Sequence, residues 1–535
     1  MKKAFFLLLL ALIFSILSSC NEKVPDEGGD ESEQPHICDF VEKSTKPKYI
    51  KTRPTCTERA EYYYSCACGE KGTETFEYGD FGGHKYGKNP ADQYLFKEAT
   101  VKTSAIYYKS CSRCGAASEN TFIHGSPIAL TDEEKQYVPA SVTVTLFDTS
   151  ESTYGFTYNT FALPLDPVIQ IKEIGDTEWE QIAPTSYEAT TQNDEGTVIS
   201  YYISKAEITL KRGTVYVYRV LDRAFGIVTP EATLKAIDPT SASFTFAHVS
   251  DSQAGPLEFG RVMGAVAGSA DFVLHGGDVV QYAHKEHEWC EMLDGNYEHI
   301  MGMPIMPIAG NHETSYNNAT FEISKHFNNK IPEQTSTALG YYYSFTYGDV
   351  KFIMLNTNDL VDDKLKAEQY NWLIGELESN TSRWIIVSIH NPMYSVGKYG
   401  ADETRNQIAL ALREQLCGVF AEYGVDLVLQ AHDHAVSRTF PLDSVGVARA
   451  EVTETLDGVE YIVDPDGVIY VMNGPAGSQG RAPIAIDESI YAYAETGRKA
   501  SWAEITVDGD TLTVTVKWHD GTSEQVYHTW GIRKS

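Results

Sequence analysis

The alternation of apolar and polar positions predicts a layered domain in the second half of the chain. Beyond residue 243, short apolar runs alternate with stretches of helical periodicity, which predicts an α/β domain over residues 243–535. A last pair of alternating runs flanks Asp508-Gly509-Asp510 and predicts a hairpin. The expected strands are 244–249, 272–274, 305–308, 351–355, 384–389, 427–429, 503–507 and 511–516, and the expected helices are 364–378 and 403–420.

Residues 135–240 carry shorter runs in which apolar and polar side chains alternate strictly. The runs at 141–146, 154–158 and 214–220 have the period of half-buried strands, and turn residues separate them. Their spacing predicts an all-β sandwich of about a hundred residues.

The start of the chain has the pattern of an export signal. Over residues 1–19, Lys2 and Lys3 precede an apolar run, and small residues then lead to Cys20. This resembles a bacterial lipoprotein signal, which implies that Cys20 is lipidated and anchors an exported protein to a membrane, on the periplasmic or surface face of a bacterial outer membrane. An ordinary cleaved signal with an unrelated cysteine is the alternative. Residues 20–34 are polar and acidic, which predicts a flexible tether.

Most cysteines gather in residues 35–130. Six of the nine lie between positions 38 and 114, in two imperfect copies offset by 45 residues. Each copy contains a Cys-x-Cys-Gly or Cys-x-x-Cys-Gly turn, and thiolates combined with histidine suit zinc. The candidate ligands of structural zinc are Cys38, Cys56, Cys66, Cys68, His84, Cys111, Cys114 and His124.

The two copies leave three alternatives open. The first turn is one residue short, and Val101 stands where the first copy has Cys56. An exported protein can form disulfides, so disulfides are an alternative to zinc, and a degenerate, metal-free module is the third. The copies resemble short Cys/His modules of secreted bacterial proteins, which implies a spacer role or a surface ligand as partner.

Charge narrows the classes of partner. The 535 residues include 43 Lys and Arg against 74 Asp and Glu, for a net charge of -31. Nucleic acid is bound through clustered cations, so this balance argues against a nucleic-acid partner. The length exceeds that of one ordinary core and predicts several domains.

Side chains with metal-binding chemistry follow five of the expected strands. Because an open α/β sheet places its site just past the carboxyl ends of the strands, we expect these side chains to converge. Carboxylate, amide and imidazole groups together suit a pair of divalent or trivalent ions such as Fe, Mn, Zn or Mg. The five segments are Asp251-Ser252-Gln253, Gly276-Gly277-Asp278, Gly310-Asn311-His312-Glu313, His390-Asn391-Pro392 and Gln430-Ala431-His432-Asp433-His434.

This order of motifs resembles the calcineurin-like metallophosphoesterases. Residues 210–220 also resemble a strand of the fibronectin type III-like N-terminal domain of purple acid phosphatases, so the resemblance covers residues 138–535. It implies a multidomain chain: small Cys/His repeats, an all-β fibronectin type III-like sandwich, and a four-layer α-β-β-α metallophosphoesterase domain. It assigns one metal to Asp251, Gln253, Asp278 and His434, and a second to Asp278, Asn311, His390 and His432.

The resemblance also implies a reaction. Asp278 would bridge two ions about 3.5–4 Å apart, which activate a hydroxide for attack on phosphorus. His312 would act as general acid toward the leaving oxygen, so Asp278 and His312 are the candidate catalytic residues.

Three positions depart from the family pattern. Gln253 replaces a histidine, which favours harder ions at the first metal. Gln281 stands where purple acid phosphatases have the tyrosine of their coloured iron centre, so such a centre is not expected. Ala431 replaces a glycine.

The sequence thus favours an exported phosphoesterase that hydrolyses phosphate monoesters or diesters. In an acidic chain the attraction of phosphate must come from the ions themselves, which favours small phosphoesters over long polyanions. The alternative is a surface binding protein that uses the Cys/His repeats and carries an inactive phosphatase-like domain.

Overall fold

The computed structural model describes residues 37–193, 195–238, 240–314, 321–332, 341–401 and 406–535. The chain divides into two compact units: Met1–Ala99 with Thr103–Ile128, and Thr100–Lys102 with Ala129–Ser535. Cys20 and the expected tether lie outside the described residues. Among the helices of the described ranges, none is both long and apolar enough to span a bilayer.

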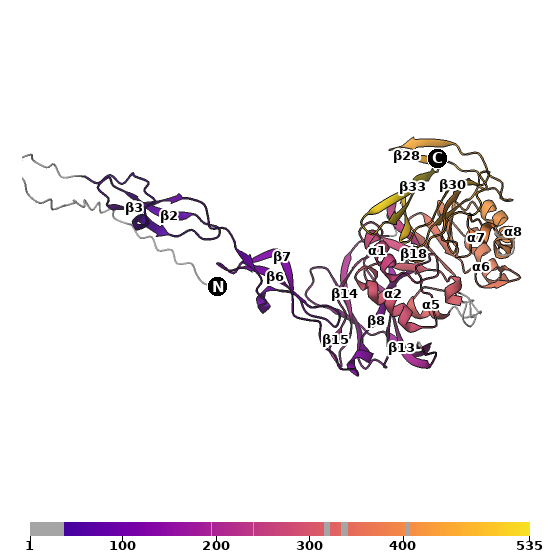
Figure 1. The fold of residues 1–535 in the computed structure, drawn as a ribbon, viewed down its shortest axis with the longest axis horizontal. Coiled ribbons are helices and arrows are strands. Elements are labelled where there is room, and N and C mark those ends of the chain that lie inside the picture. Colours follow the sequence, from indigo (N-terminus) through magenta and orange to yellow (C-terminus); the bar gives the residue numbers. More distant parts are fainter. Residues whose placement is uncertain (1–36, 194, 239, 315–320, 333–340, 402–405) are drawn as a thin grey trace, which may run out of the picture. The chain divides into compact units, whose positions relative to one another are not determined.

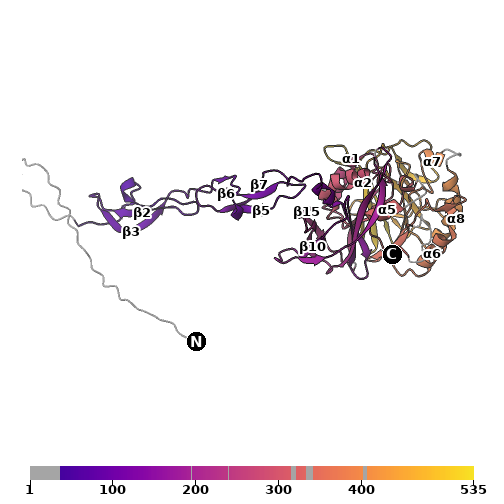
Figure 2. The ribbon, with the colours of Figure 1, turned by 90° about the horizontal axis from the view of Figure 1, so that it is seen from below.

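Two antiparallel hairpins, one in each copy of the repeat, organise the first unit (Figure 2). Each hairpin stacks a tyrosine on a phenylalanine across its strands, with ring centroids 5.9 Å apart for Tyr62–Phe76 and 5.8 Å apart for Tyr107–Phe122. The elements are η1 (Pro47–Tyr49), β1 (Ile50–Thr52), β2 (Ala60–Ser65) and β3 (Lys71–Tyr78), then β4 (Tyr86–Gly87), η2 (Asp92–Tyr94), β5 (Leu95–Lys97), β6 (Ala105–Cys111) and β7 (Ala117–His124).

The second unit begins with a two-sheet antiparallel sandwich, which fits the expected fibronectin type III-like domain. Phe156 and Tyr218, one from each sheet, meet edge to face with ring centroids 5.1 Å apart. After η3 (Glu134–Tyr137), one sheet has the order β12 (Thr185–Gln192), β13 (Val198–Thr209), β9 (Thr153–Thr160), β8 (Ala140–Asp148). The other has the order β11 (Glu180–Ile182), β10 (Pro167–Glu173), β14 (Val215–Asp222), with β15 (Ile227–Val228) and β16 (Ala232–Lys235) both on β14.

Two larger sheets form the α/β part of the second unit. The first has the order β19 (Ile305–Pro307), β18 (Phe272–His275), β17 (Ser243–Val249), β31 (Ser501–Asp508), β32 (Thr511–His519), β33 (Glu524–Arg533), β28 (Val459–Val463), β27 (Thr453–Leu456). The second has the order β20 (Tyr343–Tyr347), β21 (Val350–Met354), β24 (Trp384–Ser388), β25 (Leu427–Gln430), β29 (Ile469–Asn473), β26 (Val436–Thr439), β30 (Tyr491–Glu495). Strands β17 to β19 are mutually parallel, and so are β21, β24, β25 and β29.

Alternating side chains of the second sheet explain the layers. Phe352 and Ile386 belong to the core between the sheets, whereas Ile353 and Val387 belong to a second core with α6 (Ala367–Glu378) and α8 (Gln407–Glu422). Figures 1 and 2 show α1 (Pro256–Val266) and α2 (Glu286–Leu293) on the opposite side of the sheets from α6 and α8. The order is α-β-β-α. The shorter helices are η4 (Asp294–Asn296), α3 (Tyr297–Ile300), α4 (Asn311–Thr314), α5 (Phe321–His326) and α7 (Lys398–Ala401).

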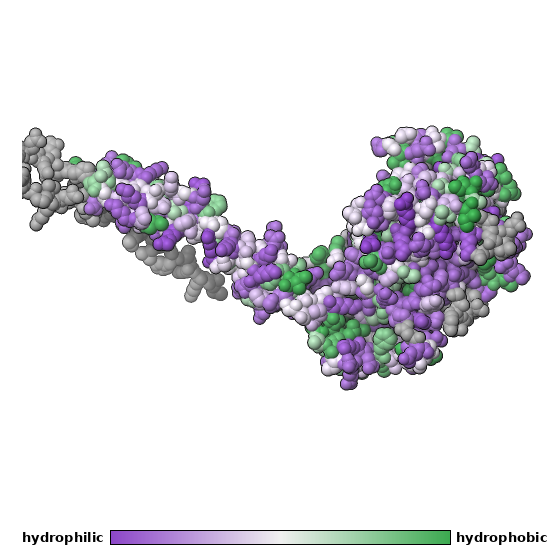
Figure 3. All heavy atoms as spheres, in the orientation of Figure 1, coloured by the Kyte–Doolittle hydropathy of each residue, from purple (hydrophilic) through white to green (hydrophobic). Residues whose placement is uncertain are grey.

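The expected elements of this part are present, with two corrections. The helix expected from residue 364 begins at Ala367, because β23 (Lys364–Leu365) pairs with β22 (Leu360–Val361) instead. The final hairpin is extended by β33, which pairs with β32. Hydrophilic residues dominate the face of the second unit seen in Figure 3, in keeping with the charge of the chain.

Candidate metal centre

The predicted ligands lie where parallel strands of both sheets end. Asp251, Asp278 and Asn311 follow β17, β18 and β19 of the first sheet, and His390 and His432 follow β24 and β25 of the second. The carboxyl ends of parallel strands meet at one edge, so the two sheets bring their ligands to a common place.

Four of the seven predicted ligands have a strained backbone. The φ angles of Asp251, Asp278, His432 and His434 are 54°, 56°, 73° and 55°, in the left-handed region that non-glycine residues rarely adopt. Such strain persists only where the surroundings over-determine it, and it is concentrated at functional sites. The strained turns aim these side chains into one cluster.

Asp278 lies at the centre of the cluster, as expected of a bridging carboxylate. Its Oδ2 is 3.3 Å from His390 Nε2 and 3.2 Å from Gln253 Nε2. The ligand atoms of Asp278, His390 and His432 all lie within 4.8 Å of one another, and Asn311 Oδ1 is 3.1 Å from His390 Nε2. The structure therefore brings together the four residues assigned to the second metal.

The residues assigned to the first metal lie on the other side of Asp278. His434 Nε2 is 3.4 Å from Asp251 Oδ1. Gln253 is buried, and its Oε1 has no hydrogen-bond partner among the described residues. A buried acceptor left unsatisfied costs free energy, which a cation at this position would remove. The donor set thus fits a metal centre.

Backbone carbonyls orient two of the imidazoles for ligation. His390 Nδ1 donates to Gly276 O over 2.8 Å, and His434 Nδ1 donates to Gln479 O over 2.9 Å. This leaves Nε2 of each ring, the atom that faces the carboxylates, as the ligand atom.

Electrostatics at the cluster also fit bound cations. Burial opposes the charge on Asp278, but His390 holds the pKa of its carboxyl below the usual range. Burial opposes protonation of His390, but Asp278 raises the pKa of its imidazole to about 9. Burial and the neighbouring His390 lower the pKa of His432 to about 3, so this imidazole is neutral and available as a ligand. The buried carboxylates of Asp251 and Asp278 draw positive charge to the site.

Glu313 has a structural role that the sequence did not reveal. It is buried, and its carboxylate accepts hydrogen bonds from the backbone N–H groups of Asp278 and Gly310 through Oε2 and of Val279 through Oε1, over 2.7–2.8 Å. Burial and the charge of Asp278 raise the pKa of Glu313 to about 7. Glu313 therefore joins the loops after β18 and β19. Its position in the motif Gly310-Asn311-His312-Glu313 is the one feature of the sequence that could have marked it as important.

His312 lies at the rim of the cluster. Its Nδ1 lies 2.9 Å from Gln281 O and 3.1 Å from Gln281 Nε2, and its Nε2 is 3.8 Å from Asp278 Oδ2. Gln281, which stands where the purple acid phosphatases have a tyrosine, therefore positions His312 in this protein. Tyr282, the next residue, is 48% exposed and does not line the cavity.

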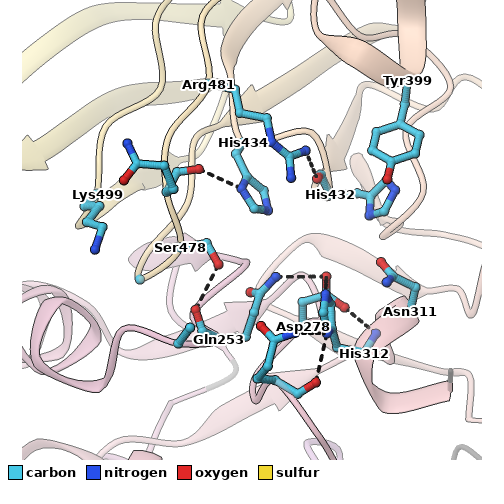
Figure 4. A pocket seen from close by; sticks show the side chains of 14 residues that line it. Gln253, Asp278, Asn311, His312, Tyr399, His432, His434, Ser478, Arg481 and Lys499 are labelled. Atoms are coloured by element: carbon cyan, nitrogen blue, oxygen red, sulfur yellow. Dashed lines mark hydrogen bonds and ion pairs between the residues drawn. The ribbon is translucent and has the colours of Figure 1, made fainter. Parts of the chain in front are cut away.

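A cavity of about 390 Å³ opens onto the cluster. In Figure 4, His432, His434, Arg481 and Tyr399 face Gln253, Asp278, Asn311 and His312 across it. The complete lining is Gln253, Ala254, Asp278, Gln281, Asn311, His312, Tyr399, His432, His434, Gly477, Ser478, Gln479, Arg481 and Lys499.

The cations of this lining correct one expectation. Arg481 and Lys499 line the cavity, so the protein itself places positive charge there, whereas the sequence led us to expect that metal ions alone would supply it. Arg481 lies 3.6 Å from the buried Asp433, which also accepts a hydrogen bond from the backbone N–H of Tyr399 over 3.0 Å. Asp433, which lies between His432 and His434 in the sequence, thus contacts two residues of the wall that faces Asp278 (Figure 4).

The Cys/His candidates of the first unit form two groups. Cys38, Cys66 and Cys68 make one, and the other consists of Cys56, His84, Cys111 and Cys114. His124 lies outside both, against the rings of Tyr107 and Phe122. Cys20 falls outside the described residues.

Comparison with known proteins agrees with this geometry. Residues 244–436 match the family model of the calcineurin-like phosphoesterases. The chain contains a calcineurin-like phosphoesterase domain. All seven predicted metal ligands of this domain lie within residues 244–436.

Parts of the chain are also similar to acid phosphatases. Purple acid phosphatase 15 of Arabidopsis thaliana is 26% identical over 311 residues, 51% of this chain and 53% of the relative. Acid phosphatase type 7 of Homo sapiens is 27% identical over 241 residues, 41% of this chain and 51% of the relative. The chain thus spans about half the length of these relatives.

A solved structure shares the fold over most of the chain. Purple acid phosphatase PPD1 from yellow lupin (Lupinus luteus) seeds has a TM-score of 0.61 at 17% identity, covering 81% of this chain and 80% of that one. The structure of PhoD has a TM-score of 0.52 at 14% identity, covering 76% and 92%.

Proposed function

We propose that this protein is an exported, membrane-anchored phosphoesterase that hydrolyses small phosphate monoesters or diesters with a two-metal centre. The proposal is supported mainly by the gathering of the predicted ligands around Asp278, through contacts of Asp278 with His390 and Gln253 and of Asp251 with His434, beside a cavity that His312 also lines. The acid phosphatase relatives support the same class of reaction.

The residues present would hold two cations. Asp251, Gln253 and His434 would hold one of them, Asn311, His390 and His432 would hold the other, and Asp278 would contribute to both. Bound there, the cations would supply an activated water and neutralise phosphoryl oxygens. The two carbonyl-bound imidazoles keep Nε2 directed at the centre, so these ligands need no reorganisation.

Other side chains of the cavity would bind and protonate the substrate. Arg481 and Lys499 offer charged donors to phosphoryl oxygens. Gln281 O would accept a proton on Nδ1 of His312, and a proton on Nε2 would then be available for transfer to the leaving oxygen. The volume of about 390 Å³ suits a small phosphoester.

Metal removal and restoration test the proposal. The full-length protein is stripped with a chelator, reloaded with Mn, Fe, Zn or Mg, and assayed on a panel of phosphomonoesters and phosphodiesters. We expect hydrolysis to vanish with the chelator and to return with at least one metal. Failure of all four metals on all substrates would support the rival hypothesis, a binding protein with an inactive phosphatase-like domain.

A further inference from the structure

A compact Cys/His group lies in the first unit, far along the sequence from the phosphoesterase domain. The ligand atoms of Cys56, His84, Cys111 and Cys114 all lie within 4.8 Å of one another. Cys56 and Cys111 are buried, and His84 and Cys114 are exposed, so the group lies at the edge of the unit, within reach of an ion from solution.

Two distances within this group are close to the edges of a tetrahedral zinc site. With Zn–S of about 2.3 Å and Zn–N of about 2.0–2.1 Å, the edges of a tetrahedron are about 3.8 Å between two sulfurs and about 3.5 Å between sulfur and nitrogen. Cys56 Sγ lies 3.6 Å from Cys111 Sγ, and Cys114 Sγ lies 3.4 Å from His84 Nδ1. Both pairs match the edges that zinc requires.

A disulfide fits the same atoms poorly. The sulfurs of Cys56 and Cys111 would have to approach by about 1.5 Å to form a bond of 2.05 Å. One disulfide would also use only two of the three thiols, and it would not explain why the third cysteine and His84 lie beside them. A metal uses all four side chains.

The surrounding backbone prepares Cys111 as a thiolate ligand. The N–H groups of Lys85 and Arg113 donate to Cys111 Sγ over 3.4 Å each. The turn itself is closed by Gly115, at φ +75°, whose carbonyl accepts a hydrogen bond of 2.7 Å from Tyr94 Oη. Donors aimed at the sulfur stabilise its negative charge and orient the ligand.

The ligands come from both copies of the repeat. Cys56 precedes β2 in the first copy, whereas His84, Cys111 and Cys114 belong to the second. Val101 occupies the place of Cys56 in the second copy, at the offset of 45 residues. This substitution has a simple explanation if Cys56 serves the following copy, because no third Cys/His group follows the second copy among the described residues.

We propose that Cys56, His84, Cys111 and Cys114 form a Cys₃His structural zinc site that cross-links the two copies of the repeat. Four protein ligands leave no open coordination position, so the site is structural rather than catalytic. Zinc there fixes the two hairpins to one another and stabilises a unit too small to rely on its apolar core.

Zinc analysis of full-length variants tests the proposal. Cys56→Ser and His84→Ala should each contain one equivalent of zinc less than the wild type, when all are purified under reducing conditions. His124→Ala is the matched control and should lose none, since His124 lies outside the group. Unchanged zinc in Cys56→Ser would overturn the proposal. The metals of the phosphoesterase domain are common to all variants and cancel in the comparison.

Alkylation of the wild-type protein gives a second test that needs no variant to fold. Mass spectrometry of the alkylated peptides should show Cys56, Cys111 and Cys114 protected until a chelator is added. Protection lifted only by a reductant would reveal a disulfide, and alkylation unaffected by the chelator would reveal a metal-free module; either result overturns the proposal.

Discussion

At the scale of the residue, the sequence predicted the residues that gather around Asp278 but not the other residues that line the cavity. Asp251, Asp278 and His432 lie two or three residues after the ends of buried strands, so local pattern and motif order suffice to place them. Arg481 and Lys499 lie in loops near the C-terminal end of the chain, where no local pattern marks them. Their position depends on how those loops fold back over the strand ends, which is a tertiary property.

Replacement of His312 tests its role as general acid. We expect His312→Ala to lower kcat by roughly 10²–10⁴-fold on phosphoesters with a poor alkoxide leaving group. The loss should be much smaller with p-nitrophenyl phosphate, because p-nitrophenolate leaves without protonation. An equal loss on both substrates would show a merely structural role for His312.

Glu313→Gln tests the carboxylate that joins the loops after β18 and β19. The amide would turn one acceptor oxygen into a donor facing backbone N–H groups, and we expect the free energy of unfolding to fall by about 3 kcal/mol. Denaturant titration measures the change, and the exposed Glu488→Gln is the control. Equal stability of the two variants would contradict the structural role.

At the scale of the element, the hydrophobic period and the composition predicted the limits of the strands well, but they predicted less well which strands pair with one another. Apolar runs such as that of β24 are bounded by polar residues, so their limits are local. The early start expected for α6 failed because Lys364–Leu365 finds a pairing partner in β22, and pairing outweighs helical periodicity there. The addition of β33 to the final hairpin likewise depends on a partner strand rather than on its own sequence.

The close approach of the loops after β18 and β19 gives a prediction at this scale. A Cβ on Gly310 would lie 2.2 Å from Asp278 Oδ1 and 2.3 Å from Asp278 N. We expect Gly310→Ala to displace the bridging carboxylate, to destabilise the protein by about 1–3 kcal/mol and to reduce its metal content.

Gly375→Ala in α6 is the matched control. A Cβ at this position meets no atom within 4 Å, so we expect a gain of about 0.4–1 kcal/mol in stability and unchanged activity. Thermal unfolding and metal analysis compare the two variants. Normal metal content in Gly310→Ala would contradict the predicted packing of the two loops.

At the scale of the whole molecule, composition separated the Cys-rich region from the rest, and the structure makes it a compact unit of its own. Composition did not show that the sandwich and the α/β part share one unit. Their union depends on contacts such as the hydrogen bond of 2.6 Å from Tyr218 Oη to Met301 O, and on a hydrophobic core continuous between them. Such contacts join residues remote in sequence and leave no local pattern.

The membrane anchor belongs to this scale and is tested in cells. We expect Cys20→Ser to shift the protein from the membrane to the soluble fraction of a bacterial host, and the wild type to carry lipid on its N-terminal peptide by mass spectrometry. Cys290→Ser is the control and should stay with the membrane. Equal partition of Cys20→Ser and wild type would contradict the anchor.

The central claim is that Asp278 joins two metal sites that carry out phosphoester hydrolysis. The most direct measurement compares kcat/KM of wild type, Asp278→Asn and the exposed control Asp466→Asn on one phosphoester, after identical loading with the activating metal. The account predicts that Asp278→Asn loses nearly all activity and at least one bound metal, while Asp466→Asn matches the wild type. If Asp278→Asn hydrolysed the phosphoester as fast as the wild type, this result would contradict the central role of Asp278.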